Sequence, residues 1–186
     1  AAIKEAAFKV SSVVKKEVRK YSVPPFTTST LQQNASNKLG FSAKKTMMLA
    51  QNLYEEGLIT YMRTDSVNLS DEAINSVRAF VSSEYGPQYL PEKPKIYKTK
   101  SKVAQEAHEA IRPTDVNKTP GKMINSLEKD QHRLYSLIWS RMVACQIKEA
   151  VYDQTTIDIS NTVNSQLPTS PSEYLFRAVG RIIKFD

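Results

Sequence analysis

The sequence predicts an α+β fold, in which a mainly helical domain, residues 23–147, is inserted into a β-rich domain formed by residues 1–22 and 148–186. Strand-like segments occupy both ends of the chain, and segments with helix boundaries and helical spacing fill the middle. Two consecutive prolines, Pro24 and Pro25, mark the first boundary. We therefore expect strands from the two ends to pair with each other across the helical insertion.

Both ends of the chain have the residue pattern of β-strands. Residues 8–23, FKVSSVVKKEVRKYSV, are rich in valine and stop at the prolines, which indicates one long strand or two short ones. Residues 152–160, YDQTTIDIS, alternate polar with β-branched residues. Residues 173–185, EYLFRAVGRIIKF, are again strand-like, and the turn-rich stretch 161–172 separates these last two segments.

Two helices are expected at the start of the helical domain. A hydroxyl residue at 28–30 can cap a helix that runs to Leu39 and stops at Gly40. Ser42 can cap a second helix, which stops at Gly57. Four apolar residues of this second helix recur at three- and four-residue spacing, so we expect them to face a core: Met47, Ala50, Leu53 and Tyr54.

Two more helices are expected further along. Ser70 can cap a helix that begins at Asp71, and the acidic residues of its first turn suit the positive end of the helix dipole. Residues 86–102 are rich in proline and lysine and predict a loop. A last long helix falls within residues 127–147. It places five apolar residues on one side: Leu134, Leu137, Ile138, Met142 and Cys145.

The composition indicates a globular protein with a polyanionic partner. Of the 186 residues, 40% are hydrophobic and 24% are charged, and the net charge of +7 favours nucleic acid as that partner. No apolar run approaches the ~20 residues that span a bilayer, and residues 1–7 lack a signal-peptide pattern. Cys145 is the only cysteine, which excludes an intrachain disulfide and a CxxC zinc site. We expect a cytoplasmic protein with no membrane partner.

Residues 57–66, GLITYMRTDS, combine groups that can act on a phosphate. A tyrosine hydroxyl, with an ordinary pKa of about 10, becomes a useful nucleophile when cations stabilise its phenolate and the phosphate under attack. Arg63 lies two residues after Tyr61, so both side chains share one face if the segment is extended. A guanidinium also binds phosphate through two parallel hydrogen bonds. An ordinary core or surface tyrosine is the competing interpretation.

Residues 105–115, QEAHEAIRPTD, form a second candidate segment. If the stretch is helical, His108 and Arg112 lie on one face, where both can hold a phosphate. The segment is not a zinc protease motif, because Arg112 stands where the second histidine would be. Pro113 ends any helix there. An ordinary surface histidine is the competing interpretation.

The helices expected over residues 30–39 and 43–56 are joined by a short turn, which suits a helix-turn-helix. Gln51 and Glu55 form an i, i+4 pair on the second helix, just before the chain reaches Tyr61. Ordinary packing of two helices explains the same pattern.

The run TSTLQQNASNKLGFSAKKTMMLAQNLYEEGLITYMRTDS, followed by QEAHEAIRPTDV, resembles the tyrosine domain of type IA DNA topoisomerases. The resemblance extends from about Pro25 to about Ile147, and more weakly through the flanking strands. Met62 stands where topoisomerase III-like members tend to have proline. This residue and the His-Glu-Ala-Ile-Arg-Pro run are similar to the bacterial topoisomerase I branch of the family.

This resemblance implies three catalytic residues. Tyr61 would form a 5′-phosphotyrosine link with cut single-stranded DNA, Arg63 would steady the scissile phosphate, and His108 would contact the phosphate or its neighbour. Further residues match positions that bind DNA or support the tyrosine: Gln51, Glu55, Thr60, Thr64 and Asp65, with Arg112 as a structural or DNA-backbone contact.

The resemblance also implies what the chain does and what it lacks. The family relaxes negative supercoils without ATP, and its Mg²⁺-binding acidic cluster and catalytic lysine lie in a Toprim domain that nothing in this chain resembles. We therefore expect no metal site here, a Toprim-containing remainder as partner together with single-stranded DNA, and an inactive fragment when alone. The terminal strands would belong to the arch or hinge of an enzyme that acts at the bacterial nucleoid.

Two other functions fit the residues without the resemblance. A non-catalytic helix-turn-helix module would bind duplex DNA selectively and would be indifferent to Tyr61→Phe. An inert scaffold or interaction domain would show no salt-sensitive binding of nucleic acid.

Overall fold

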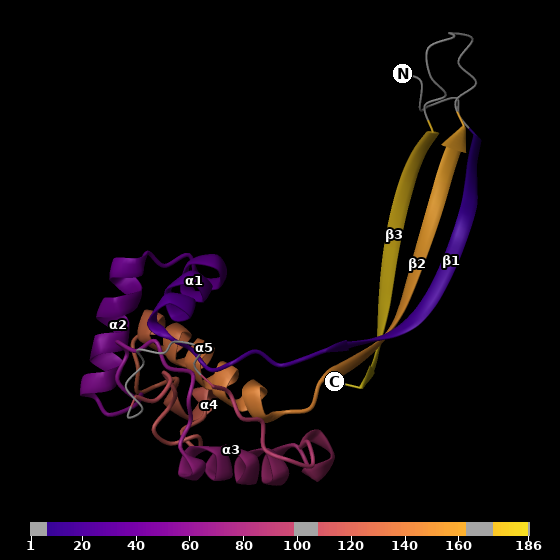
Figure 1. The fold of residues 1–186 in the computed structure, drawn as a ribbon. Helices are drawn as coiled ribbons and strands as arrows, with labels where there is room; N and C mark the ends of the chain where they lie inside the picture. The colour runs from indigo at the N-terminus through magenta and orange to yellow at the C-terminus, as the bar shows by residue number, and fades with distance from the viewer. Residues whose placement is uncertain (1–6, 99–107, 163–172, 186) are drawn as a thin grey trace. The chain divides into compact units, whose positions relative to one another are not determined.

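The computed structural model describes residues 7–98, 108–162 and 173–185. The chain divides into two compact units, one formed by residues 1–21 with 149–186 and the other by residues 22–148. The first unit contains a β-sheet and the second is mainly helical (Figure 1). The expected α+β class is confirmed, whereas the roles of arch and catalytic domain stay predictions.

The sheet contains three antiparallel strands in the order β1-β2-β3. Their bounds are Ala7–Lys20 for β1, Ala150–Thr162 for β2 and Glu173–Phe185 for β3. Strands from the two ends of the chain pair, as expected, because β1 and β2 are hydrogen-bonded along their lengths. The register shifts once on β1, between Val10 and Ser12. Most of the stretch expected to be rich in turns, 163–172, lies outside the described residues.

Cross-strand ion pairs match the register of this sheet. Arg177 on β3 lies opposite Asp158 on β2 and binds its two carboxylate oxygens at 2.7 and 2.9 Å. Hydrogen bonds from Arg177 hold the pKa of Asp158 below its ordinary value. Lys184 reaches Glu17 at 3.3 Å, which links β3 to β1 across the middle strand. Opposite charges on neighbouring strands therefore favour this register over a slipped one.

The helical unit begins with α1, Thr28–Leu39, and α2, Ala43–Glu55. Then follow α3, Asp71–Glu84, and α5, Lys129–Gln146, with two short elements between them, the 3₁₀ helix η2, Pro87–Tyr89, and α4, Pro120–Met123. None of the helices in the described part of the chain is long and apolar enough to cross a membrane.

Side-chain caps define where the helices begin. Ser42 and Ser70 accept hydrogen bonds from the first turns of α2 and α3, as predicted. The cap of α1 is Thr27, one residue before the expected range, and it forms a reciprocal capping box with Thr30. Gly40 ends α1 with φ of 72°, a left-handed conformation that favours glycine.

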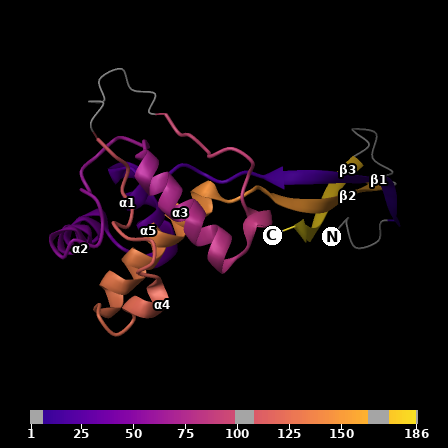
Figure 2. The same cartoon turned by 90° about the horizontal axis from the view of Figure 1, so that it is seen from below.

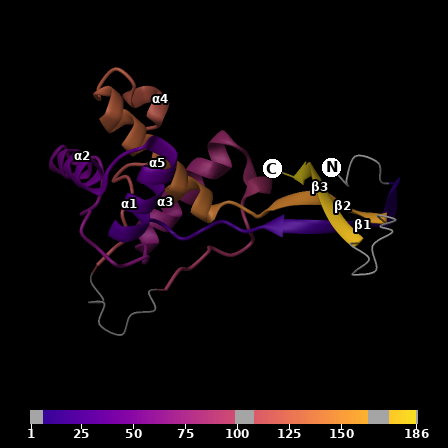
Figure 3. The ribbon, with the colours of Figure 1, turned by 90° about the horizontal axis from the view of Figure 1, so that it is seen from above.

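Helix α5 organises the core of this unit. It packs against α1, α2, α3 and α4, and Figures 2 and 3 show it among them. Its fully buried residues include Leu134, Tyr135 and Ile138. The Tyr135 hydroxyl donates to the Lys118 carbonyl at 2.6 Å, and burial raises the tyrosine's pKa to about 12. Trp139 packs edge-to-face on Phe80 of α3 with ring centroids 5.5 Å apart, which joins two helices distant in sequence.

The buried face of α2 differs from the prediction. Its buried residues are Thr46, Leu49, Ala50 and Leu53. Met47 is only half-buried and Tyr54 is 40% exposed, so the expectation that Tyr54 faces the core is wrong. Two overlapping sets of residues recur at helical spacing here, and the position of α5 decides which set is covered.

Leu53→Ala should lower the free energy of unfolding of the helical unit by about 2–5 kcal/mol, because it opens a cavity at a fully buried site. Met48→Ala on the same helix is the matched control, since Met48 is 56% exposed, and should change it by less than about 0.5 kcal/mol. Urea unfolding followed by the fluorescence of Trp139, the only tryptophan, measures this unit alone. Equal destabilisation by the two variants would contradict this assignment of the buried face.

Candidate active site

The chain reverses after α2 and then runs through Tyr61 as an irregular segment with one isolated β-bridge at Ile59. Gly57 makes the reversal with φ of 69°, and its N–H donates to the Tyr54 carbonyl at 2.8 Å. Burial then alternates along the chain, with Met62, Thr64 and Ser66 inside and Tyr61, Arg63 and Asp65 exposed. The backbone is irregular here, with bends at residues 62 and 63, so this alternation does not come from a strand. Tyr61 and Arg63 are both exposed and both line one pocket.

Thr60 ties the residue before the tyrosine to a distant segment. Its N–H donates to the Arg112 carbonyl at 2.9 Å, and its hydroxyl donates to the Ala110 carbonyl at 2.7 Å. The same hydroxyl accepts a hydrogen bond from the Arg112 N–H at 3.0 Å. Thr60 therefore fixes residues 110–112, and with them the neighbouring His108, relative to Tyr61.

Thr28 ties down the chain on the other side of the tyrosine. Lying in the first turn of α1, it donates through its hydroxyl to the Met62 carbonyl at 2.8 Å and accepts from the Thr64 N–H at 2.9 Å. Its own N–H donates to the Thr64 carbonyl at 2.8 Å. The backbone is thus held on both sides of Tyr61, while the tyrosine side chain remains 49% exposed.

A pocket of about 280 Å³ lies over this segment. Its lining consists of Thr60, Tyr61, Arg63, Thr64, His108 and Glu109. All three residues predicted to be catalytic, Tyr61, Arg63 and His108, meet here although one of them is distant in sequence. Two of the residues predicted to bind DNA or support the tyrosine, Thr60 and Thr64, also line it.

Four predicted site residues lie outside this pocket. Gln51 donates to Glu55 at 2.6 Å, so these two residues form the i, i+4 pair expected on α2. Asp65 is exposed, like Tyr61. Arg112 lines a different pocket.

His108 and Arg112 would share one face only if their segment were helical, and the structure does not meet this condition. Residues 108–113 are not helical, and isolated β-bridges pair Ile111 with Phe26 and Pro113 with Ile59. An extended chain separates residues four apart by about 13 Å, so the two side chains reach different pockets. Residues 105–107, at the start of this candidate segment, lie outside the described residues.

Arg112 is held by an internal ion pair. Its guanidinium donates to Glu109 at 2.7 Å and to the Pro113 carbonyl at 3.1 Å, and the side chain is only 15% exposed. The second Glu109 oxygen accepts from the Ser70 N–H at 2.7 Å, at the beginning of α3. Burial by itself raises the pKa of Glu109, but the hydrogen bonds from Arg112 and Ser70 outweigh it, and the pKa is lowered.

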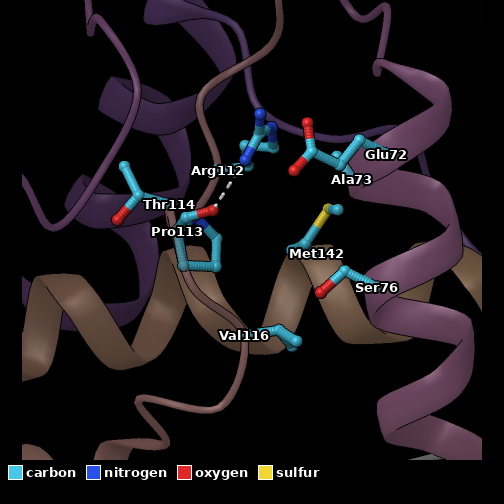
Figure 4. A pocket seen from close by; sticks show the side chains of 8 residues that line it. All are labelled: Glu72, Ala73, Ser76, Arg112, Pro113, Thr114, Val116 and Met142. Carbon is cyan, nitrogen blue, oxygen red and sulfur yellow. Dashed lines mark hydrogen bonds between the residues drawn. The ribbon is translucent and has the colours of Figure 1, made fainter.

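The pocket beside Arg112 has a volume of about 280 Å³ and lies between residues 112–116, α3 and α5. Figure 4 shows the Glu72 carboxylate of α3 pointing toward Arg112, with Met142 of α5 and Ser76 of α3 lower in the view. The Arg112 Nε is buried and has no hydrogen-bond partner among the described residues.

Two neighbours of the site were missed by the sequence analysis. Glu109 follows His108 directly, and the reach of its carboxylate to α3 depends on the tertiary fold. Tyr54 packs its ring edge-to-face against the Tyr61 ring, with centroids 5.2 Å apart and the planes at 67°. The one sequence signal for this contact is the presence of a tyrosine on each side of Gly57, where the chain was expected to turn.

The described residues contain no group of three or more His, Cys, Asp or Glu side chains placed to hold a metal ion. Cys145 is buried in the core, and burial raises the pKa of its thiol to about 12. This thiol is therefore protonated at neutral pH and is no candidate nucleophile.

Glu109→Gln should lower the free energy of unfolding at neutral pH by about 1 kcal/mol, because it removes a charge-assisted pair. Since the folded-state pKa of Glu109 lies below its ordinary value, the carboxylate stabilises the fold above that value. This contribution begins to fall near the ordinary pKa of a glutamate and is lost as the pH falls through the lowered pKa, so the two proteins should converge once the pH is below that lowered pKa. Trp139 fluorescence during urea unfolding measures the difference, and the exposed Glu92→Gln is the control. A gap that persists in acid would contradict the ion-pair explanation.

Comparison with known proteins gives one consistent result. A profile of the DNA topoisomerase family matches residues 1–186. DNA topoisomerase 1 of Rickettsia bellii is 48% identical over 192 residues, covering 99% of this chain and 23% of that protein. The Pasteurella multocida DNA topoisomerase 1 is 50% identical over 184 residues, covering 99% of this chain and 20% of that protein.

A solved structure agrees with these relatives. Full-length topoisomerase I from Thermotoga maritima matches with a TM-score of 0.74 and 36% identity, over 96% of this chain and 28% of that one. The chain therefore spans about a fifth to a quarter of the length of the curated relatives named above. With the whole sequence matched by one family and its fold shared with a solved member, the chain belongs to the DNA topoisomerase family, in its type IA class.

Proposed function

We propose that this chain carries the nucleophile of a type IA DNA topoisomerase that relaxes negative supercoils. Tyr61 attacks a phosphate of single-stranded DNA, a bond forms between its phenolic oxygen and phosphorus, and the bond to the 3′-oxygen breaks. One phosphodiester replaces another, so the bond energy is retained and resealing by the 3′-hydroxyl needs no ATP. The observation that carries this proposal is the meeting of Tyr61, Arg63 and His108 in one pocket.

Arg63 is the proposed electrostatic partner of the reaction. Arg63 is exposed and lines the same pocket as Tyr61. A phosphate bound there gains charge as the phenolic oxygen attacks, and a guanidinium stabilises that charge through two hydrogen bonds. His108 is the second proposed contact to the phosphate, since it reaches the pocket from the segment that Thr60 anchors.

Supporting roles follow from the hydrogen bonds around the tyrosine. We assign Thr60 and Thr64 to holding its backbone, because both residues bond to neighbouring segments. A nucleophile held in place before the DNA binds loses less entropy at the transition state. Gln51, Glu55 and Asp65 are exposed or half-exposed and stay proposed DNA contacts. The partly buried ion pair of Arg112 with Glu109 favours a structural role for Arg112 over a contact to the DNA backbone.

The chemistry also requires a proton for the departing 3′-oxygen. Among the described residues, no lysine lines the pocket and no cluster is suited to a magnesium ion. We therefore assign the general acid and Mg²⁺ to a Toprim-containing remainder of the enzyme and the β-sheet unit to its arch or hinge. The enzyme would act on bacterial DNA in the cytoplasm, and this chain by itself should neither cleave DNA efficiently nor relax it.

Mixing this chain with the Toprim-containing part of a related DNA topoisomerase 1, single-stranded DNA and Mg²⁺ should yield a covalent adduct. A 5′-phosphotyrosine link retains the downstream DNA, so a 3′ label should stay with the protein in a denaturing gel and a 5′ label should leave. Tyr61→Phe should abolish the adduct, because the attacking oxygen is absent.

Tyr85→Phe is the control for this experiment, since Tyr85 is 47% exposed and lies at the end of α3. Absence of any adduct, together with selective binding of duplex DNA that Tyr61→Phe leaves unchanged, would favour the helix-turn-helix module instead, and an adduct that survives Tyr61→Phe would place the nucleophile elsewhere. Robust relaxation of supercoiled DNA by the isolated chain would contradict the assignment of the acid and the metal to another part.

Arg63→Ala should slow adduct formation by about 10²–10³-fold at saturating DNA, as expected for loss of one group that stabilises transition-state charge. Arg63→Lys should recover only part of this rate, because an ammonium keeps the charge and loses the two-point grip. Single-turnover gel assays of the mixed proteins measure both rates. A full rate in Arg63→Ala would remove Arg63 from the proposed mechanism.

A further inference from the structure

We propose that Tyr54 is a positioning residue for Tyr61, and this inference rests on the function proposed above. The Tyr54 ring holds the Tyr61 ring in the orientation in which it lines the pocket. Tyr54 does not touch the reacting atoms in this account and acts through the nucleophile alone.

A positioning residue is needed because the backbone contacts do not fix the side-chain rotamer of Tyr61. Hydrogen bonds fix the chain at Thr60 and at Met62, on either side of the tyrosine. The Tyr61 side chain is nevertheless 49% exposed, and its hydroxyl has no hydrogen-bond partner among the described residues. An exposed tyrosine can occupy several staggered rotamers, so a fixed backbone alone does not fix the phenolic oxygen.

Tyr54 supplies the one ring contact that the structure records for Tyr61. The two rings meet edge to face, with centroids 5.2 Å apart and the planes at 67°, which is a favourable geometry for aromatic pairs. The contact lies on the solvent side of α2, where Tyr54 is 40% exposed and buries little in the core. Tyr54 is not part of the hydrophobic core, and its recorded ring contact is with Tyr61.

The backbone of Tyr54 is fixed by the end of α2 and by the turn that follows it. It lies in the last turn of α2, next to Leu53, which is fully buried. Its carbonyl accepts the Gly57 N–H at 2.8 Å, and the Leu53 carbonyl accepts the Leu58 N–H at 2.9 Å. These two bonds close the turn that returns the chain toward the end of α2. The helix, the turn and the ring contact therefore form one short connection from the core to Tyr61.

The contact requires the ring of Tyr54 and not its hydroxyl, so two substitutions of Tyr54 should have different effects. Tyr54→Phe keeps the ring and should preserve the contact, whereas Tyr54→Leu removes it. Tyr85→Leu is the matched control, because Tyr85 is similarly exposed and makes an edge-to-face contact with Phe80 at 6.0 Å in the same unit. Trp139 fluorescence during urea unfolding checks that every variant is folded.

The first measurement needs no activity. In ¹³C–¹H NMR spectra of the tyrosine rings, the Tyr61 signal is identified by its absence in Tyr61→Phe. Tyr54→Leu should move this signal toward the shift of a free tyrosine, since the neighbouring ring current is lost. Tyr54→Phe and Tyr85→Leu should leave it near its original position. An unchanged Tyr61 signal in Tyr54→Leu would overturn the proposal.

The second measurement is the covalent-adduct assay with the Toprim-containing part. Tyr54→Leu should lower the rate at saturating DNA by about 3- to 10-fold, the range expected for loss of one aromatic pair, and Tyr54→Phe should restore it. The affinity for DNA should remain unchanged. Weaker DNA binding with a normal saturated rate would overturn the proposal and make Tyr54 a base-stacking surface.

The failure of this inference and that of the proposed function are distinguishable. If the adduct forms in the absence of the Tyr61 hydroxyl, the proposed function fails, and with it the role of Tyr54 in positioning a nucleophile. If the adduct requires Tyr61, but Tyr54→Leu changes neither the Tyr61 NMR signal nor the rate of adduct formation, only the inference fails.

Discussion

The site depends on the hydrogen bonds that two threonines make on either side of Tyr61. Thr60 joins the tyrosine segment to residues 110–112, and Thr28 joins it to the beginning of α1. The segment between α2 and α3 is irregular and belongs to no β-sheet, so these bonds are what fix its backbone near Tyr61. Because its polar backbone groups are satisfied by distant segments, a short irregular stretch can be as well placed as a strand.

The two arginines near Tyr61 differ in their surroundings, which assigns one to the fold and the other to the proposed chemistry. Glu109 neutralises Arg112 and accepts a hydrogen bond at the beginning of α3, so this ion pair holds the His108 segment in place. Arg63 remains exposed in the pocket with Tyr61, where a phosphate can reach it. An arginine that is already paired with a carboxylate attracts an incoming anion less strongly than an arginine that is exposed to water.

Much of the fold followed from local patterns. Serine caps at Ser42 and Ser70, the glycine stop at Gly40 and alternation in the terminal strands each act within a few residues, and the structure agrees with them. The prediction was wrong for the side of α2 that carries Tyr54, because periodicity gives a face and only the neighbouring helix decides which face is covered. The sequence left open whether His108 and Arg112 share a helical face, and they do not, since bridges to other segments hold that chain in a non-helical conformation.

The sequence by itself determined the residue types available for phosphate chemistry, the order of the two motifs and the positions where helices begin. Those depend on covalent spacing and on hydrogen bonds between near neighbours. Tertiary structure alone decided that His108 meets Tyr61 in one pocket, that Arg112 is withdrawn into an ion pair with Glu109, and that Tyr54 packs on the nucleophile. These outcomes depend on contacts between segments that only the folded core brings together, and spacing along the chain does not encode them.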